Sequence, residues 1–420
     1  MYKQYFKQAI ATIRENPLVS FLTILGTALA VAMMMVLVLV YQVKTASFAP
    51  VSERHRMLYV SAIEGLNDKN AGFRGGALGY RIINECFYPM TTPESITAVG
   101  AHVRQKQTSA PGSKTVRECD VRETDAAFWK VFDFRFLNGV PYTPEMVTSA
   151  IPVAVVSERV AREFFGTTQV AGLSIQLDFV DYRIQGVVAS VSEAVSEAYG
   201  EIWIPYTLNR DIMSGGMVEG IGGQLQLCML AKSTADFDAI RQEAQNRVAT
   251  FNTGQKEFLA NIWKQPLSST QQMFYYAPED RMHGNFSGML SLAALFLFLP
   301  VFNLLAMMFS QMQKRNPEFG LRKAFGATTK DIVGQILAEN FIITLLGSII
   351  GLFLSFLFFY ITKDSLLQRP DVNLQLSMIF KPALFAAALL TCLVINLLST
   401  TFPAWRTSRA EVVDSLNTNI

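Results

Sequence analysis

The sequence is short of charge. Of its 420 residues only 17% are charged, half are hydrophobic, and the formal net charge is +2. Soluble domains carry about 25% charged residues, so the deficit indicates that much of the chain lies in a lipid bilayer. The near-neutral balance also argues against a general nucleic-acid-binding protein, because such proteins concentrate an excess of Lys and Arg.

Cysteine and histidine are scarce as well. The cysteines are Cys86, Cys119, Cys228 and Cys392, and the histidines are His55, His102 and His283. The cysteines are too few and too widely spaced for a disulfide scaffold or a zinc ribbon. Cys86 and Cys119 form either a disulfide in an oxidising compartment or two buried thiols, and the sequence favours neither. No histidine has a partner at metal-ligand spacing, so we interpret all three as isolated polar or surface residues.

The sequence also lacks the short motifs of common enzymes. It contains no G-x-S-x-G, no H-E-x-x-H and no calcium-binding loop. No Gly-Lys dipeptide occurs, so these residues hold no phosphate-binding loop and are not expected to hydrolyse ATP. Glu193, Glu197 and Glu201 recur at helical spacing, which we interpret as a solvated helix face. We therefore predict no catalytic residue, no metal site and no cofactor bound by this chain.

Four long apolar runs are present. Crossing about 30 Å of hydrocarbon takes roughly 20 apolar residues. The runs predict transmembrane helices at residues 18–43, 286–312, 339–362 and 382–402. The first run is much longer than the apolar region of a signal peptide, about 7–15 residues, so we expect an uncleaved anchor.

Lys and Arg near the span ends predict the orientation. The segments 1–17, 313–338 and 403–420 are basic and must share one side of the membrane if there are four spans. We therefore expect both termini to be cytoplasmic. Residues 363–381 then form a short outer loop. Residues 44–285 form an extracytoplasmic domain, since they are too many for a loop.

The pattern of this outer domain mixes helices and strands. Alternating apolar residues predict half-buried strands at 132–136 and 173–179, and a short apolar run predicts a buried strand at 152–156. Ser157 can cap a helix that ends at Gly166. A second amphipathic helix is predicted over 237–251 and a mobile, glycine-rich loop over 67–79. The predicted fold is an α-helical membrane protein with four transmembrane helices and a mixed α+β extracytoplasmic domain between helices 1 and 2.

The segment between the second and third spans, residues 313–338, contains several helix signals. Pro317 and Glu318 favour the start of a helix, Gly326 can end it, and Thr328 or Thr329 can cap the next. These signals predict a short amphipathic helix at the inner surface, with Phe319, Leu321 and Phe325 available to bury. The alternative is a basic loop that only satisfies the charge rule for cytoplasmic segments.

Residues 318–328 read EFGLRKAFGAT and closely resemble the E-I-G-[IV]-R-[KR]-A-[LF]-G-A motif of the MacB/FtsX family of ABC transporter permeases. The first helix at 16–23, the glycines of the third helix and the ending at 403–416 are similar to the same family. Residues 139–188 resemble its periplasmic core domain. These matches occur in the family's order along nearly the whole chain.

The resemblance implies a bacterial inner-membrane permease that works as a dimer over two ATPase subunits. The dimer is either a homodimer or a heterodimer with a related permease. ATP and Mg²⁺ belong to the ATPase, while membrane lipid and a periplasmic adaptor are further expected partners. The residues expected to couple to the ATPase are Glu318, Phe319, Gly320, Leu321, Arg322, Lys323, Phe325 and Gly326.

Helix packing within the membrane is expected at four positions. Gly347 and Gly351 are spaced to permit close helix approach, and Asn303 and Asn396 can hydrogen-bond between helices. No charged residue lies deep in a predicted span, which disfavours an ion-coupled carrier.

Three functions remain open at this point. The leading hypothesis is a permease that transmits ATPase motion to the outer domain and so exports or extracts a substrate. The second is a regulatory permease, like the cell-division branch of the family, which activates an outer partner such as a cell-wall hydrolase without transport. The third is a membrane-anchored receptor, which would associate with no ATPase.

Overall fold

The structure is a computed structural model of the 420-residue chain. It describes residues 17–45, 49–69, 71–113, 115–191, 195–214, 216–274, 321–322 and 324–366, together with Arg14, Ser47, Glu193 and short stretches between 382 and 401. These residues belong to two compact units, one within Lys44–Ser287 and one that contains the long apolar helices. Each unit is described by itself.

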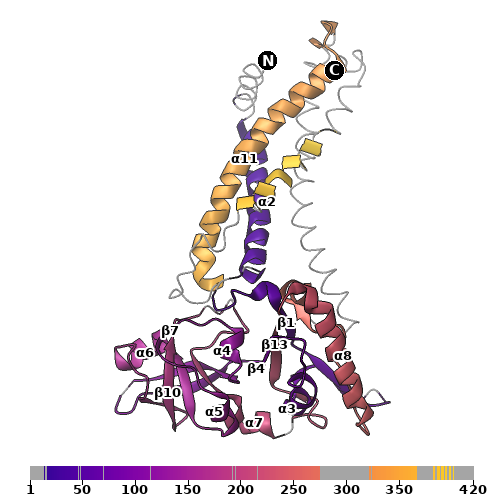
Figure 1. Ribbon diagram of the computed structural model, residues 1–420. Helices are drawn as coiled ribbons and strands as arrows, with labels where there is room; N and C mark the ends of the chain where they lie inside the picture. Colours follow the sequence, from indigo (N-terminus) through magenta and orange to yellow (C-terminus); the bar gives the residue numbers. More distant parts are fainter. Residues whose placement is uncertain are drawn as a thin grey trace. The chain divides into compact units, whose positions relative to one another are not determined.

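The apolar unit contains helices α2 (Pro17–Thr45) and α11 (Thr329–Leu366), drawn in indigo and orange in Figure 1. Among the described residues, Thr329–Phe358 is long and apolar enough to cross a membrane, and Ser20–Val36 is a shorter apolar stretch. α11 begins at Thr329, so residues 329–338 of the segment predicted as a cytoplasmic connection belong to the same helix as the predicted third span. The span predicted at 286–312 lies outside the described residues, and the one at 382–402 is described only in part.

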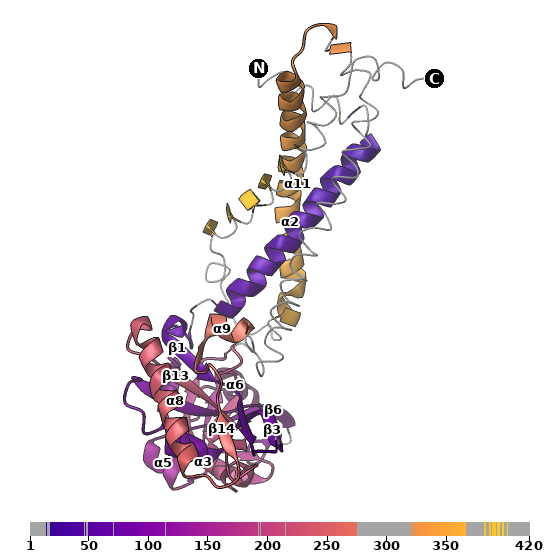
Figure 2. The same cartoon turned by 90° about the vertical axis from the view of Figure 1, so that its right-hand side faces the viewer.

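The larger unit is an α+β domain with one extended system of paired strands (Figures 1 and 2). Its strands are β1 (Met57–Val60), β2 (Ile63–Leu66), β3 (Gly72–Leu78), β4 (Ser95–Gly100), β5 (Arg104–Ser109), β6 (Val116–Thr124), β7 (Phe136–Gly139), β8 (Val153–Ser157), β9 (Ser174–Leu177), β10 (Val180–Val188), β11 (Ile202–Pro205), β12 (Gly222–Gly223), β13 (Leu225–Leu230), β14 (Leu259–Asn261) and β15 (Leu267–Ser268).

Its helices are short except for one. They are α3 (Tyr80–Ile82), which runs into a π-helix at Ile83–Phe87, α4 (Phe128–Val131), α5 (Pro144–Thr148), α6 (Glu158–Phe165), α7 (Arg210–Met213), α8 (Phe237–Thr253) and α9 (Ser269–Phe274). Single 3-10 turns lie at Arg54–Arg56, Tyr206–Leu208 and Thr234–Asp236.

Six strands of this domain close into a ring. Following the pairings gives β6, β11, β8, β10, β9 and β5, and β5 pairs again with β6. Alternate residues of these strands share one buried core, as strand geometry requires, and α6 adds apolar side chains to it. Examples are Val121, Val156, Ile184 and Ile202, all fully buried.

The second part of the domain packs helices on a sheet. β13 pairs with β1 and β4, and the apolar face of α8 packs with the π-helix against this sheet. Figure 2 shows α8 running along β13 and β1. Ile240, Ala244, Val248 and Phe251 form the buried face of α8, as the sequence predicted.

A cluster of aromatic side chains joins the two parts. Trp129 contacts Phe134, Phe136, Tyr142 and Trp203 with ring centroids 5.2 to 6.1 Å apart. Trp203 comes from the ring strand β11, while the same core includes buried residues of β1, β4 and β13. Aromatic pairs at these separations add stability beyond the area that they bury.

Several predicted elements are confirmed. The apolar run predicted as a buried strand forms β8, all of whose residues are buried. Ser157 caps α6 by accepting a hydrogen bond from the Val160 amide, and Gly166 ends this helix in a left-handed conformation with φ of 73°. The 237–251 helix is α8.

Three predictions were wrong in part or whole. The strand predicted at 132–136 begins only at Phe136, because the preceding residues leave α4 and pack into the aromatic cluster without pairing. The strand predicted at 173–179 ends at Leu177, because Asp178 and Phe179 form a turn. The loop predicted over 67–79 contains β3, which pairs with β2 and β12 despite its glycines.

The cysteine alternatives are resolved in favour of thiols. Cys86, Cys119 and Cys228 are free and buried. Cys86 lies in the core beneath α8 and Cys119 in the core of the ring, so the two belong to different cores. Burial raises the pKa of Cys119 to about 11 and that of Cys86 to about 12, which keeps both thiols protonated at neutral pH. Cys392 lies outside the described residues.

Phe179 predicts a stabilising substitution. Asp178 and Phe179 connect β9 to β10 with φ of 48° and 66°, and Phe179 is 86% exposed. Two-residue hairpins of this kind favour Asp-Gly, since glycine adopts positive φ without strain. Phe179→Gly should stabilise the domain by about 0.5–1 kcal/mol, measured by thermal unfolding of the full chain in detergent. Phe179→Ala keeps the strain, so an equal gain from Ala would contradict this explanation.

Candidate functional site

The start of α11 is fixed by a reciprocal cap. The amide and hydroxyl of Thr328 donate to Asp331 Oδ2 over 3.0 and 2.5 Å, and the Asp331 amide donates to Thr328 Oγ1 over 3.3 Å. Such a capping box satisfies amides that would otherwise lack partners in the first turn of a helix. Of the two predicted caps, Thr328 is the one used.

The helical turn before this cap ends at Gly326. The Phe325 amide donates to the Leu321 carbonyl over 3.1 Å, and the Ala327 amide donates to the Arg322 carbonyl over 3.0 Å. Gly326 sits between these donors with φ of 95°. This is the pattern of a Schellman ending, in which glycine takes the left-handed position. A short helical turn and α11 are thus joined by a defined corner at residues 325–328.

Two large apolar side chains of this segment are exposed. Leu321 is 55% exposed and Phe325 is 85% exposed. They are four residues apart, so they lie on the same face of the turn. An apolar face on a basic, polar segment is a candidate contact surface for another protein.

The same turn is tied to the interior of its unit by a chain of hydrogen bonds. Arg322 Nη1 donates to Gln335 Oε1, and Gln335 Nε2 donates to Glu339 Oε1 over 2.8 Å. Gln335 and Glu339 are both buried, on successive turns of α11. If the turn separated from α11, the buried side chain of Gln335 would lose its hydrogen bond from Arg322. Leaving a buried polar group without its partner costs free energy, so this separation is unfavourable. The turn and the first part of α11 are therefore linked by side-chain hydrogen bonds as well as by the main chain.

Gly347 and Gly351 lie against α2. A Cβ atom on Gly347 would lie 2.8 Å from Thr27 Cβ, and one on Gly351 would lie 2.5 Å from the Ala28 carbonyl oxygen. The neighbouring buried residues are also small, among them Ser20, Thr23 and Thr27 of α2 and Thr344 and Ser348 of α11. Small residues of this kind let two helix backbones approach closely.

The other predicted site residues fall outside the described part of the chain. Those of the coupling segment are Glu318, Phe319, Gly320 and Lys323, and those of the helices are Asn303 and Asn396. Within the described residues, no group of three or more His, Cys, Asp or Glu side chains could hold a metal ion.

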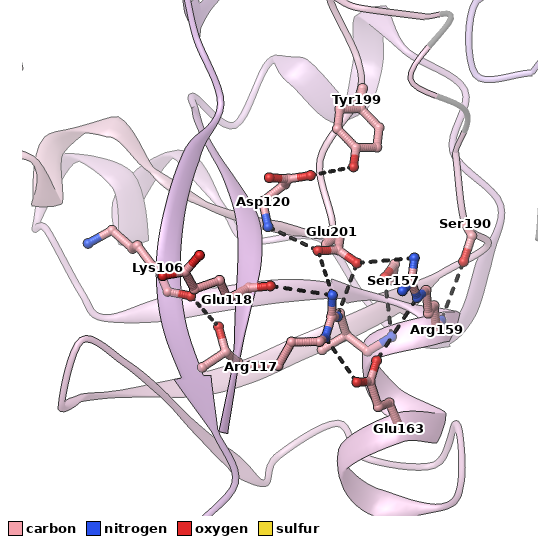
Figure 3. A network of polar contacts seen from close by, with 12 residues as sticks. Lys106, Arg117, Glu118, Asp120, Ser157, Arg159, Glu163, Ser190, Tyr199 and Glu201 are labelled. Atoms are coloured by element: carbon pink, nitrogen blue, oxygen red, sulfur yellow. Dashed lines mark hydrogen bonds and ion pairs between the residues drawn. The ribbon is translucent and has the colours of Figure 1, made fainter. Parts of the chain in front are cut away.

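In the α+β domain the structure brings together a polar network that the sequence did not predict (Figure 3). Glu201 is buried and accepts from Arg117 Nη1 and Nη2 over 3.2 and 3.1 Å and from the Asp120 amide over 3.0 Å. Arg117 also pairs with Glu163 at 2.9 Å. Burial, the largest single influence, lowers the pKa of Arg117. The hydrogen bonds that Arg117 donates to Glu201 and the negative charges of Glu201 and Glu163 together outweigh burial, so the pKa is raised.

This network corrects the interpretation of Glu193, Glu197 and Glu201 as a solvated helix face. Residues 195–201 form turns and extended chain, and Glu201 directly precedes β11. The glutamate spacing was therefore coincidental. No local pattern predicts the network: Arg117 and Arg122 are five residues apart on β6 and so lie on opposite faces of that strand, and Glu201 is 84 residues from Arg117.

Arg122 holds the segment before Glu201 in place. Its guanidinium donates to the carbonyls of Tyr199, Gly100 and Ser196 over 2.8, 2.6 and 2.5 Å. The residue is only 3% exposed, and burial lowers its pKa. Three carbonyl acceptors satisfy a buried cation in a geometry that fixes both chain segments.

Comparison with known proteins identifies the family. The model of the MacB-like periplasmic core domain matches residues 20–247, and that of the FtsX-like permease C-terminal region matches residues 290–412. The chain belongs to the MacB/FtsX family of ABC transporter permeases. The α+β unit is accordingly the family's periplasmic domain, carried on a membrane region, and MacB/FtsX permeases work with ABC ATPase partners.

The curated relatives of this permease are longer than the chain. It is 25% identical over 294 residues to the macrolide export ATP-binding/permease protein MacB of Burkholderia lata, covering 69% of this chain and 39% of that protein. It is 23% identical over 450 residues to the protein of the same name from Shewanella sp. (strain W3-18-1), covering 99% of this chain and 60% of that protein. The chain thus spans about two fifths of the Burkholderia relative.

Among solved structures, the crystal structure of the periplasmic region of MacB from Actinobacillus actinomycetemcomitans is similar to this permease. The similarity covers 51% of this chain and 90% of that one, with 13% identity and a TM-score of 0.36.

The packing of α2 against α11 predicts that replacing glycine by alanine changes stability in opposite directions at different positions of α11. Gly347→Ala and Gly351→Ala should each destabilise the permease by about 1–3 kcal/mol, because the added methyl forces the two helices apart. Gly334→Ala meets no atom within 4 Å and should raise stability, since glycine disfavours a helix. Thermal unfolding in detergent measures all three. Equal stability of the Gly351 and Gly334 variants would contradict the α2–α11 contact.

The network around Glu201 predicts a large loss of stability on a small change. Glu201→Gln removes the buried negative charge that accepts from two guanidinium nitrogens of Arg117. It should cost about 1.5–3 kcal/mol, because Arg117 then keeps only the more exposed Glu163 as an ionic partner. Glu158→Gln is the matched control, since Glu158 pairs with Arg162 on an exposed helix face and such pairs contribute about 0–1 kcal/mol. Urea unfolding followed by circular dichroism separates the two, and similar midpoints would refute the role of the network.

Proposed function

We propose that the chain is the transmembrane subunit of an ABC transporter and that it converts ATPase closure into movement of its periplasmic domain to export or extract a substrate. The observation that carries this proposal is the corner at residues 321–339. There the turn that exposes Leu321 and Phe325 also carries Arg322. Arg322 is hydrogen-bonded to Gln335, which is hydrogen-bonded in turn to the buried Glu339 of the long helix α11.

The length of α11 suits it to transmit motion. It has 38 residues, so at about 1.5 Å per residue it is about 57 Å long, more than the hydrocarbon thickness of a bilayer. A single continuous helix moves as a rigid body more readily than two helices joined by a loop. A push on Leu321 and Phe325 would enter α11 through the corner at residues 325–328 and the Arg322–Gln335 hydrogen bond, and would then reach the far end of α11 along one continuous helix.

The expected assembly follows from the family. Two copies of a cytoplasmic ABC ATPase would bind ATP and Mg²⁺, and two permease chains, identical or related, would lie above them in the bacterial inner membrane. In this arrangement both termini and residues 313–338 are cytoplasmic. ATP hydrolysis is assigned to the partner, because these 420 residues contain no phosphate-binding loop.

The coupling proposal predicts the effect of changing the exposed face. Phe325→Asp should weaken binding of the ATPase subunit by about 30-fold, since a large exposed aromatic is a typical anchor of an interface. Replacing Arg322 or Glu318 by Ala should reduce the ATPase stimulation that the permease gives, while membrane insertion stays normal. Lys330→Ala, an exposed change in the same segment, is the control. Binding is measured by co-purification and stimulation by phosphate release in proteoliposomes.

Two outcomes would overturn the proposal. If the Phe325, Arg322 and Glu318 variants all keep full binding and stimulation, this segment is not the coupling element. If the unaltered permease stimulates hydrolysis and activates a bound periplasmic hydrolase but moves or releases no substrate, the chain is a regulatory permease instead. A chain that co-purifies with no ATPase would be a receptor.

A further inference from the structure

Strand β5 of the ring is paired along its whole length on one side only. All of Arg104–Ser109 pairs with β6, while β9 pairs with only the last two residues of β5. Arg104–Lys106 is therefore an edge of the sheet. In an antiparallel ladder the main-chain groups of alternate residues point to the same side. The main chain of Gln107 bonds toward the β9 side, so the amide and carbonyl of Gln105 point to that side as well.

The turn between β9 and β10 limits how far this edge extends. The Gln107 amide donates to Asp178 Oδ1 over 3.0 Å, and the Asp178 amide donates to the Gln107 carbonyl over 2.9 Å. Asp178 Oδ2 also lies 3.1 Å from Lys106 Nζ. These contacts hold the turn against β5 just beyond Lys106. An incoming strand can therefore pair with the exposed Gln105, but it must end or bend beside the turn.

No partner for the Gln105 main chain lies on this side among the residues that the structure describes. Water solvates such an edge in the free protein, and a strand of another polypeptide can replace this water with main-chain hydrogen bonds. A strand that pairs antiparallel here would exchange both hydrogen bonds between Gln105 and one of its own residues.

The second residue of the turn is both strained and exposed. Phe179 has φ of 66° and is 86% exposed, and Val180 after it is 52% exposed. Glycine would take the conformation of Phe179 without strain, and the exposed ring adds little to the buried core. A large apolar side chain that folding does not require, held at a strained position, points to a role in contact rather than in stability.

We propose that the β5 edge and the Phe179 turn together form a docking site for an extended segment of another polypeptide. The segment would accept from the Gln105 amide, donate to the Gln105 carbonyl, and place an apolar side chain on Phe179 where it leaves the edge. Main-chain pairing gives affinity in complexes of this kind, and side-chain contacts give specificity. A lipid surface would contact Phe179 but would have no use for the Gln105 main chain.

A second copy of this chain does not fit the site through the same edge. If two β5 strands paired antiparallel around Gln105, Gln107 of each copy would lie opposite Val103 of the other. In each copy the space beside Gln107 is already taken by the turn at Asp178. Each strand would therefore collide with the other copy's turn. The occupant is a strand of a different protein.

The test uses the full chain in detergent micelles and a phage-displayed library of random linear nonapeptides, with counter-selection on the Gln105→Pro variant. Selected peptides are synthesised, and their binding is measured by fluorescence anisotropy. They should bind the unaltered chain saturably. Gln105→Pro removes the edge amide but no hydrogen bond of the free domain, and should weaken binding about tenfold or more. Gln105→Ala is the matched control, since it changes the side chain and keeps the amide, so binding should be unchanged.

Two further measurements do not depend on how well the proline variant folds. N-methylation of the central peptide residue that pairs with Gln105 removes the donor to its carbonyl, and should weaken binding about tenfold or more. Phe179→Gly should weaken binding about tenfold although it stabilises the domain, because the apolar contact is lost. Leu173→Ala removes another exposed apolar side chain, at the other end of β9, and should have no effect.

The inference is overturned if the library yields no peptide that binds saturably, or if the Gln105→Pro and Gln105→Ala variants bind alike. It is equally overturned if no N-methylated peptide binds more weakly than its parent, or if Phe179→Gly and Leu173→Ala leave binding equally strong. Since no ATPase is present, these outcomes do not depend on the coupling function proposed above.

Discussion

The buried guanidinium of Arg122 organises much of the periplasmic domain. Its three hydrogen bonds to main-chain carbonyls fix residues 196–199 against the end of β4. With that segment fixed, the next residues bring Glu201 beneath Arg117 and lead β11 into the gap between β6 and β8. Closure of the six-strand ring depends on this placement, since β11 is the strand that pairs with both β6 and β8. Burying the Arg122 cation would cost much free energy without these carbonyl acceptors. The path of residues 196–199 therefore stabilises the charge, and the charge in turn fixes that path.

The membrane region relies on a smaller set of interactions of a different kind. Its corner is built from a left-handed Gly326, a Thr328–Asp331 cap and the Arg322–Gln335–Glu339 chain. Each of these limits how the exposed turn can move relative to α11. Further along, α2 and α11 meet through glycine, serine and threonine. The polar links at the start of α11 and the close backbone contact between α2 and α11 together suit a part of the protein that moves as one body.

Local signals explain which features could be predicted from the sequence. The cap at Ser157, the ending at Gly166 and the apolar face of α8 depend on neighbours within one or two turns, and all three are confirmed. The pairing of β3, the turn at Phe179 and the role of Glu201 depend on partners far away in the chain. The coupling segment was found through its resemblance to a family motif. Its link to Gln335 and Glu339 was not predicted, because the contact between Arg322 and a residue 13 positions later depends on the corner that the chain makes at Gly326.

The closed ring of strands has a consequence for how other proteins can recognise the domain. Each ring strand has a paired neighbour on both sides, so only short stretches such as Arg104–Lys106 of β5, which pair on one side, leave an edge to which a foreign strand could add. Recognition at most of the ring therefore depends on side chains of turns and connections, which can vary in sequence without disturbing the pairing. The ring is in this sense a fixed frame whose rim can change its specificity while its fold is kept.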